Sequence, residues 1–329
     1  KLEEKRNRSI SVLNESLSPS PEILCSFLDN EKNRLRLWER SYEDADFLAV
    51  RLGLGSRPFD VHIKIPRQGF QLHEDELRQL PVELSEKYGI LKNVPWALDI
   101  RQNNTVGIIG SEDHIRLIIE EIALNIISLH AYDEVKLVFV VPSKQAEQFE
   151  PLKNVPHVWS NDKRVRYFAT NSDEVHYIFN VIDDDIKERE ESDDKNIPMI
   201  PHYVLMITEP ELVEKEALLR YVQNTEQEFG LTAVFAYGDI AKLPKFCQTI
   251  IQSDEKRTGY YTKNKNANRF IPFKPDSIEE TKVREFTNKL SHLPIKKDSR
   301  TLGIADSVTF LEMYKVGNVD ELDIERYWD

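Results

Sequence analysis

Residues 106–117 have the order of a phosphate-binding turn, in which an apolar stretch ends in Gly110 and a long apolar helix pattern follows after a few polar residues. In such a turn the backbone N–H groups and the helix N-terminus point together at a phosphate. A glycine allows the backbone the close approach that this contact needs. Gly110 is therefore a candidate cofactor-binding residue.

The side chains that normally complete this turn are replaced. The pattern G-x-x-x-x-G-K-[ST], laid on the sequence from Gly110, places Ile115, Arg116 and Leu117 where glycine, lysine and a hydroxyl residue belong. A β-branched Ile115 opposes the approach of phosphate, and Leu117 has no oxygen for Mg²⁺. Arg116 keeps a cation near the turn and is a second candidate cofactor-binding residue, although at a helix start it can equally form a surface salt bridge.

A second nucleotide motif is also incomplete. Nucleotide-hydrolysing proteins hold Mg²⁺ with an acid at the end of an apolar strand, and a following glutamate activates water. After the apolar residues 203–207, Thr208 stands at the metal-holding position and Glu209 follows it. Thr208 is thus a candidate cofactor-binding residue and Glu209 a candidate catalytic residue. Glu209 can instead be an acid favoured by the dipole of the helix predicted for residues 210–229.

Other polar clusters favour structural roles over metal or nucleic-acid sites. The acidic run at 183–195 is typical of a solvated helix end and loop. His157 and His202 have no Cys or Asp at ligand or triad spacing, so we expect core or rim histidines. The basic, aromatic stretch at 256–265 is either a contact for a phosphate backbone or, more commonly, an exposed hairpin.

Composition narrows the classes further. The formal charge of −13 disfavours nucleic acid as a partner. Cys25 and Cys247 lie far apart in the chain, which predicts neither a zinc site nor a disulfide framework and favours a reducing compartment. The longest apolar stretches, at 117–129 and 135–141, fall short of the ~20 residues that cross a bilayer. We expect a folded chain that does not itself span a membrane.

The elements that must position these residues alternate along the chain. Apolar strands without polar alternation are each followed by a helix pattern, which predicts a parallel sheet covered on both faces. The expected strands are 106–110, 135–141, 165–169, 203–208 and 231–236, and the expected helices are 113–130, 146–152, 172–190 and 210–229. This indicates a doubly wound α/β fold of the RecA/P-loop NTPase type with degenerate motifs.

Shorter elements flank this alternation. A charged helical pattern, broken at residues 18–21, predicts a stalk over 1–40. Alternation before and after a Gly-containing turn at 53–58 predicts a β-hairpin. The remaining expected elements are a helix at 74–88, strands at 98–101, 249–252 and 259–261, a helix at 277–292, and a docking linker at 302–329.

Several segments together resemble one family. They are residues 38–40, 46–55, 94–95 before Asp99, 154–157, and 304–311 with Trp328. These segments are similar to the EssC/EccC proteins, the FtsK/SpoIIIE-type ATPases of type VII secretion. The resemblance covers most of the chain from residue 38 onward and is strongest in the predicted hairpin.

The resemblance implies a domain division. In that family two membrane helices and a stalk, with a forkhead-associated region in the EssC branch, precede a domain that is followed by tandem FtsK-like ATPase domains. Residues 1–40 would be the stalk, 41–295 a degenerate ATPase-like domain with the hairpin, and 296–329 the linker to the next ATPase domain. A chain that begins in a charged helical run and stops without a cap also suggests a piece of a longer protein.

The resemblance also implies a function. The chain would be a cytosolic coupling and assembly module, at the cytoplasmic face of the cell membrane, in a membrane-anchored motor ATPase that drives protein export. Its partners would be the downstream ATPase domains and the membrane components of the secretion core complex, in a homo-oligomer of the full protein. Mg-ATP would bind downstream domains, with no cofactor and no metal in this fragment, which we expect not to be catalytic.

Two alternatives stay open at this point. One is an atypical nucleotide-binding NTPase that uses Arg116 and Glu209. The other is a DNA-contacting module, as in FtsK/SpoIIIE translocases, that uses the stretch at 256–265.

Overall fold

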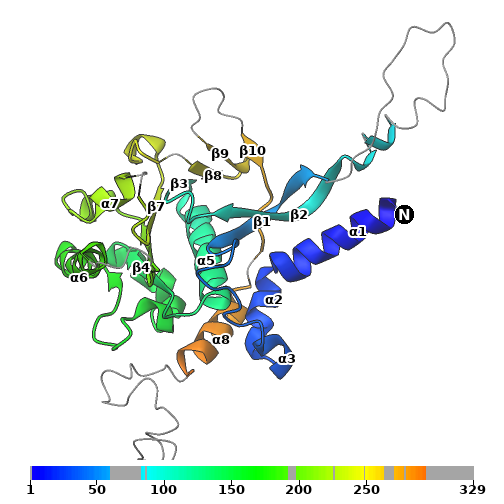
Figure 1. Cartoon of the computed structure of the whole chain (residues 1–329). Coiled ribbons are helices and arrows are strands. Elements are labelled where there is room, and N and C mark those ends of the chain that lie inside the picture. Colours follow the sequence, from blue (N-terminus) through cyan, green and yellow to red (C-terminus); the bar gives the residue numbers. More distant parts are fainter. Residues whose placement is uncertain are drawn as a thin grey trace, which may run out of the picture.

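The computed structural model describes residues 2–59, 83–85, 87–191, 198–224, 227–247, 249–262, 270–277 and 279–293. Within these residues, eight strands form a mainly parallel sheet in the order β10-β9-β8-β3-β7-β6-β4-β5. The strands are β3 (Thr105–Gly110), β4 (Val135–Val140), β5 (Phe168–Ala169), β6 (His202–Ile207), β7 (Leu231–Tyr237), β8 (Thr249–Ser253), β9 (Thr258–Thr262) and β10 (Ile271–Pro272). Figure 1 shows the sheet at the centre of the molecule with helices on either side.

Strands β3, β4, β6 and β7 are ones that the sequence predicts from their unbroken apolar runs. The strand expected at 165–169 is reduced to the two residues of β5, and β8, expected only as a short strand, is also parallel. Strands β4, β6 and β7 are buried at every position, as a sheet covered on both faces requires. Strand β3 lies between β8 and β7, and without the two-residue β5 the parallel strands stand in chain order 5-1-4-3-2. This is the order of a RecA-like P-loop NTPase fold, and the predicted fold class is confirmed.

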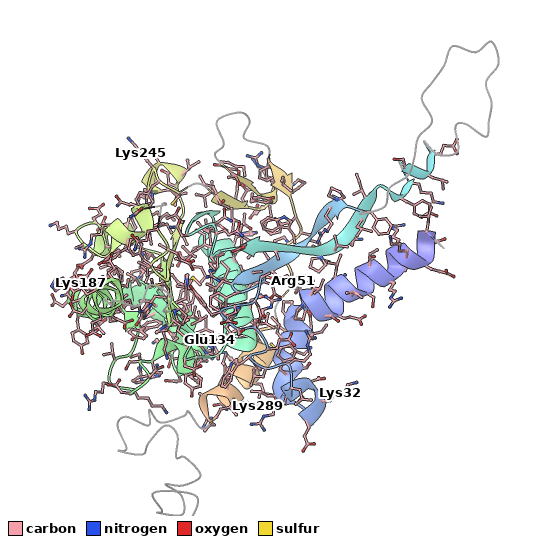
Figure 2. The ribbon with its side chains drawn as sticks, viewed as in Figure 1. Lys32, Arg51, Glu134, Lys187, Lys245 and Lys289 are labelled. Carbon is pink, nitrogen blue, oxygen red and sulfur yellow. The ribbon has the colours of Figure 1, made fainter. Side chains whose placement is uncertain are left out.

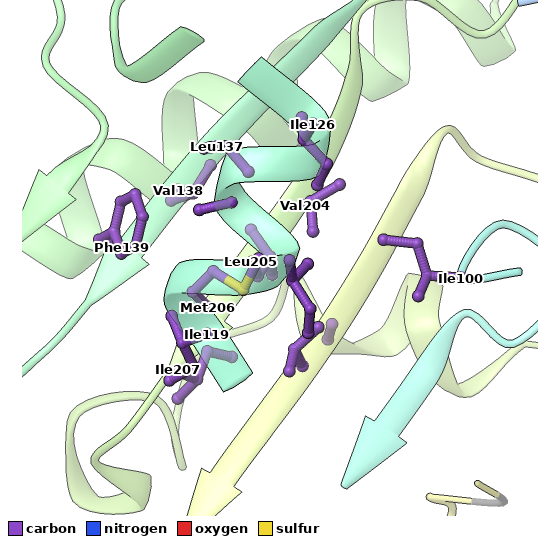
Figure 3. Packing of buried hydrophobic residues seen from close by; sticks show 14 of the residues in the cluster. Ile100, Ile119, Ile126, Leu137, Val138, Phe139, Val204, Leu205, Met206 and Ile207 are labelled. Carbon is purple, nitrogen blue, oxygen red and sulfur yellow. The ribbon is translucent and has the colours of Figure 1, made fainter. Parts of the chain in front are cut away.

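Helices cover the two faces of this sheet (Figure 1). Helix α5 (Glu112–Leu129) lies on one face, and α6 (Ser172–Glu190) with α7 (Leu219–Gln223) lies on the other. Figure 3 shows Ile119 and Ile126 of α5 packed against Leu205 and its neighbours in β6 and β4. Three further elements connect the layers and close the domain: η3 (Ser143–Leu152), η4 (Pro156–Val158) and α8 (Glu280–Ser291).

The prediction of one helix over residues 210–229 is wrong. The chain forms a short turn of 3-10 helix, η5 (Pro210–Leu212), and then α7, with irregular residues between them. Val213 and Leu218 are both buried in the core. The backbone N–H groups of Val213, Glu216 and Leu219 donate to carbonyls three residues back, so this segment advances in tight turns and not in α-helical ones. A further 3-10 turn, η6 (Ile240–Lys242), follows β7.

The predicted hairpin is replaced by a longer one. Strand β1 (Ala49–Pro58) continues through the expected turn at 53–58, with register shifts at Arg51/Gly53 and Gly55/Ser56, and pairs antiparallel with β2 (Ile90–Asp99). Gly53 lies within this strand with φ +146°, so close to the Lys274 carbonyl that a Cβ would sit 2.1 Å from its oxygen. The glycine serves this close approach and no turn. Residues 61–65 and most of the helix expected at 74–88 lie outside the described residues.

The N-terminal segment is helical, as expected. It contains α1 (Leu2–Val12), the π-helical η1 (Leu13–Leu17), α2 (Pro21–Cys25), η2 (Ser26–Leu28) and α3 (Glu31–Arg34). Leu24 and Phe27 are buried in the main core, so this segment packs on the α/β domain from residue 21 onward. Helix α1 extends away from the domain beside the hairpin (Figure 1). In the part of the chain described, none of the helices has the length and apolar character of a bilayer span. The linker expected at 296–329 lies outside the described residues.

Candidate functional site

The carboxyl ends of the parallel strands bring together three residues singled out in the sequence. Ile115 and Arg116 on α5 and Thr208 after β6 line one cavity of about 190 Å³. The other residues of its lining are Glu112, Gln145, Gln148, Phe149, Ala236 and Gly238. This is the edge at which α/β folds bind ligands, because loops converge there.

The connection that precedes the cavity is too short to surround a phosphate. Strand β3 ends at Gly110 and α5 begins at Glu112, so only Ser111 separates them. The Ile115 N–H already donates to the Ser111 carbonyl at 2.9 Å, within the helix. A phosphate cradle needs several unengaged N–H groups along a loop. The expected loop is therefore absent from this connection.

Close packing within the sheet explains why residue 110 is a glycine. A Cβ at this position would lie 1.9 Å from the Ser253 carbonyl oxygen of β8, which forbids any side chain. Gly110 is not among the residues that line the cavity. The close packing of β3 against β8 accounts for this glycine without a ligand.

Arg116 is engaged within its own helix. Its Nη1 lies 2.7 Å from Oε1 of Glu120, one turn farther along α5, and the two side chains are 26% and 15% exposed. Burial raises the pKa of Glu120, and the Arg116 charge opposes that rise. This is the salt bridge that the sequence left open as an alternative. Leu117 is 37% exposed and points away from the cavity, toward a neighbouring depression beside Glu280.

Thr208 and Glu209 have separate surroundings. The Thr208 hydroxyl donates to Oε1 of Gln145 at 3.2 Å and so crosses the cavity toward η3. Glu209 is half-buried outside the cavity lining, where its charge adds to the burial that raises the pKa of Tyr237. Because the helix predicted after Glu209 is interrupted, no long helix dipole accounts for this acid.

The donor set at this edge fits Mg-ATP poorly. The cavity is smaller than the roughly 300–1,000 Å³ of usual ligand pockets. Glu112 is the only acid on its described lining, where its charge would face a triphosphate, and the one cation, Arg116, is paired with Glu120. The glutamines that narrow the site, Gln145 and Gln148, come from η3, and no motif in the sequence marks them.

A second constellation, which the sequence does not predict, holds the end of the N-terminal helix. Arg36 donates to the carbonyls of Glu15 and Ser16 at 2.7 and 2.9 Å. Arg40 donates to Leu17 O at 2.6 Å, and Arg51 to Ser18 O at 2.7 Å. Helices leave their last carbonyls without partners, so these three guanidinium groups cap the C-terminal end of η1. We call Arg36, Arg40 and Arg51 the arginine clamp.

The deepest member of the clamp, Arg51, is 3% exposed and is fixed from the domain side (Figure 2). Its Nε and Nη2 bind the two oxygens of Asp276 at 2.5 and 3.0 Å. Glu121 of α5 is 1% exposed and lies against the same carboxylate. Burial first, and the Asp276 charge second, raise the pKa of Glu121 well above its usual range. Four distant parts of the chain thus meet at one buried polar joint.

The remaining sequence candidates have structural roles. His157 is a core histidine as expected, and its Nε2 donates to the His130 carbonyl at 2.8 Å. In the acidic run, Asp183 forms ion pairs with Lys187 and Arg220. Within the described ranges, no group of three or more His, Cys, Asp or Glu residues could hold a metal ion. Residues 258–262 of the basic stretch form β9, which pairs with β8.

The chain is similar in sequence to curated secretion proteins. No family model matches it. The ESX secretion system protein EccC of Geobacillus thermodenitrificans is 26% identical over 314 residues, which is 94% of this chain and 21% of the relative. The type VII secretion system protein EssC of Staphylococcus aureus is 27% identical over 300 residues, 89% of this chain and 20% of the relative. The chain therefore spans about a fifth of the length of the curated relatives it matches.

The chain is also similar to solved structures. One contains ATPases 2 and 3 of EssC from Geobacillus thermodenitrificans. Its sequence is 12% identical to this chain, and the match covers 80% of this chain and 53% of the solved chain, with a TM-score of 0.47.

Proposed function

Since this chain belongs to the EssC/EccC family of type VII secretion proteins, we propose that it is a cytosolic module that couples a membrane-anchored motor to its base during protein export. Residues 1–40 would form the stalk, residues 41–295 a degenerate ATPase-like domain, and residues 296–329 the linker to the next ATPase domain. The module would act at the cytoplasmic face of the membrane, within a homo-oligomer of the full protein.

The arginine clamp is the observation that supports coupling. A module that transmits force or position between a helix and a domain needs a stiff joint between them. Here three guanidinium groups, two from the segment at 36–40 and one from β1, bind four consecutive carbonyls, of residues 15–18. Charge-assisted hydrogen bonds of this kind are roughly twice as strong as neutral ones. The clamp would hold α1 at a fixed angle to the sheet.

The cavity at the carboxyl edge supports a module that does not hydrolyse nucleotide itself. Its short β3–α5 connection and its paired Arg116 support a module without a Mg-ATP site of its own. The downstream domains of the parent protein would bind Mg-ATP. Those domains and the membrane components of the core complex are the partners that we propose.

The double substitution Arg36→Gln with Arg40→Gln in the full-length parent protein tests this role. We expect protein export by cells to fall at least severalfold, while the purified parent keeps its rate of ATP hydrolysis. Arg34→Gln is the matched control, because Arg34 is exposed and lies beside the clamp on the same segment. Unchanged export in the clamp variant, with normal protein levels, would refute the coupling role.

A further inference from the structure

A larger cleft lies at the opposite edge of the sheet. It has a volume of about 600 Å³ and opens at the amino ends of three parallel strands, beside Thr105, His202 and Leu231. The loop at residues 43–47 and the turn at 99–104 complete its wall. Nothing in the coupling function uses this cleft.

The wall of the cleft is rich in carboxylates. Its acids are Glu43, Asp44, Asp99 and Glu228. Among the described residues of the lining, Arg101 is the one basic side chain, and Glu228 neutralises it across 2.7 Å. The Arg101 guanidinium also lies 4.2 Å from the centre of the Tyr42 ring, which holds it against the wall. The lining keeps a net negative charge and would repel an anionic ligand.

A buried histidine adds an unused acceptor. His202 is 1% exposed, and its Nε2 lies 2.9 Å from the Thr232 hydroxyl. That hydroxyl donates to the Ile100 carbonyl at 2.9 Å, so its oxygen must accept the proton of Nε2–H. The other ring nitrogen, Nδ1, is then an unprotonated acceptor, and it has no hydrogen-bond partner among the described residues. Burial lowers the pKa of His202 to about 3, which keeps the ring neutral.

Aromatic rings supply the rest of the lining. Phe47, Tyr221 and Phe229 are largely buried and border the cleft. Phe47 packs edge-on against the His202 ring, with centroids 6.2 Å apart. Apolar surface beside a negative wall matches a ligand that carries a cation at the end of a hydrocarbon stem.

We propose that this cleft binds the side chain of an arginine or lysine presented by a partner peptide. The cationic N–H groups would donate to Glu43, to Oδ1 of Asp44, to Oδ2 of Asp99 and to Nδ1 of His202, because the other oxygens of Asp44 and Asp99 already accept bonds from the chain. The methylene stem would lie against the aromatic rings. The carboxylates and Nδ1 are acceptors, and a guanidinium or ammonium group is a pure donor. The proposal does not depend on the coupling function.

The test uses the whole chain, labelled with ¹⁵N, and a blocked Ala-Arg-Ala peptide as the probe. We expect saturable shifts in the NMR signals of Gln102 and Asn104, both on the cleft wall. Blocked peptides with Gln or Glu in place of Arg should give no such shifts. Equal binding of the Gln peptide, or stronger binding of the Glu peptide, would overturn the proposal. Tighter binding by spermidine than by the peptide would assign the cleft to free polyamines and overturn the choice of a peptide.

A variant of the cleft wall provides the second arm. Glu43 is exposed, so the Glu43→Gln variant should fold normally. It should weaken binding of the Ala-Arg-Ala peptide by about two- to fivefold. Glu147→Gln is the matched control, because Glu147 is exposed on η3 at the other edge of the sheet. Raising the salt concentration to 0.5 M should weaken binding to the unaltered chain and narrow the difference between the variants. Peptide binding that Glu43→Gln leaves unchanged would refute the assignment.

Discussion

Single buried residues set how this chain responds to pH, and Glu121 is the clearest case. Burial and the neighbouring Asp276 raise its pKa in the folded state, while Arg51 opposes the rise and Glu22 adds to it. An acid with a raised folded pKa contributes stability that is fully present below its unfolded pKa. That contribution is lost as the pH rises through the folded pKa.

Glu121→Gln should therefore remove the loss of unfolding free energy that ionisation of Glu121 causes as the pH rises. Gln keeps a hydrogen-bond donor for Asp276 but cannot ionise. We expect the variant to gain unfolding free energy relative to the unaltered chain as pH rises from 5 to 9, by at most ~1.4 kcal/mol per pH unit. Urea unfolding at several pH values measures this. Glu147→Gln should show no such trend, and a flat difference for Glu121→Gln would contradict a protonated Glu121.

The residues of the carboxyl edge predict weak nucleotide binding. Ile115 lines the cavity, Arg116 is paired with Glu120, and Thr208 offers a neutral hydroxyl that is already bonded to Gln145. Charge-assisted hydrogen bonds contribute ~1.5–3 kcal/mol each, so losing two or three of them should lower the affinity for Mg-ATP by several orders of magnitude. Calorimetry should find little or no binding, unchanged in Arg116→Ala. Micromolar binding that disappears in Arg116→Ala would establish the atypical NTPase instead.

At the scale of elements, the sequence predicts what local periodicity determines. Helix α6 has the expected bounds, 172–190, and α5 differs from its prediction by one residue at each end. Both have apolar residues at helical spacing along their length. The parallel strands are equally visible, because runs such as 203–207 have no polar alternation.

Pairing between distant segments is what the sequence does not reveal. The partner of β1 is β2, with more than 30 residues between them, and no local signal selects it over residues 61–65. Glycine is common in turns, yet Gly53 lies within a strand, against the carbonyl of Lys274. The clamp and the Arg51–Asp276 pair join residues far apart in the chain, so only the folded structure brings them together.

Gly53 and Gly55 form a matched pair that tests this account of β1. Ala at Gly53 would need φ +146° and would meet the Lys274 carbonyl oxygen at 2.1 Å, whereas Ala at Gly55 would meet Trp96 at an ordinary 3.4 Å. We expect Gly53→Ala to lower the free energy of unfolding by about 1–3 kcal/mol and Gly55→Ala to change it by less than about 0.5 kcal/mol. Urea unfolding compares them. Similar values for the two variants would contradict the strain assigned to Gly53.

The whole molecule should lose stability in mild acid. His130, His157 and His202 are fully buried, and burial lowers the pKa of each below its usual value, to about 3 for His157 and His202. A base with a lowered folded pKa contributes stability that is complete above its unfolded pKa of ~6.5 and decreases as pH falls toward the folded pKa. The three histidines therefore destabilise the fold together below about pH 6.

His157→Gln should make this decrease shallower. Its amide can still donate to the His130 carbonyl, but it takes up no proton, so the slope between pH 6 and pH 4 should fall by up to ~1.4 kcal/mol per pH unit. Thermal or urea unfolding over this range measures the slope. His176→Gln serves as the comparison because His176 is exposed. An equal effect of the two substitutions would show that burial of His157 is not the cause.

Helix α1 turns the clamp into the fulcrum of a lever. Its 11 residues reach about 16 Å from η1 at the helical rise of 1.5 Å per residue. A rotation of roughly 10° at the joint would displace the far end of α1 by only about 3 Å over that length. A helix that continued on the N-terminal side of residue 2 would increase this displacement in proportion to its length. The same four hydrogen-bonded carbonyls would then decide how much a distant end can swing, although none of them lies near it.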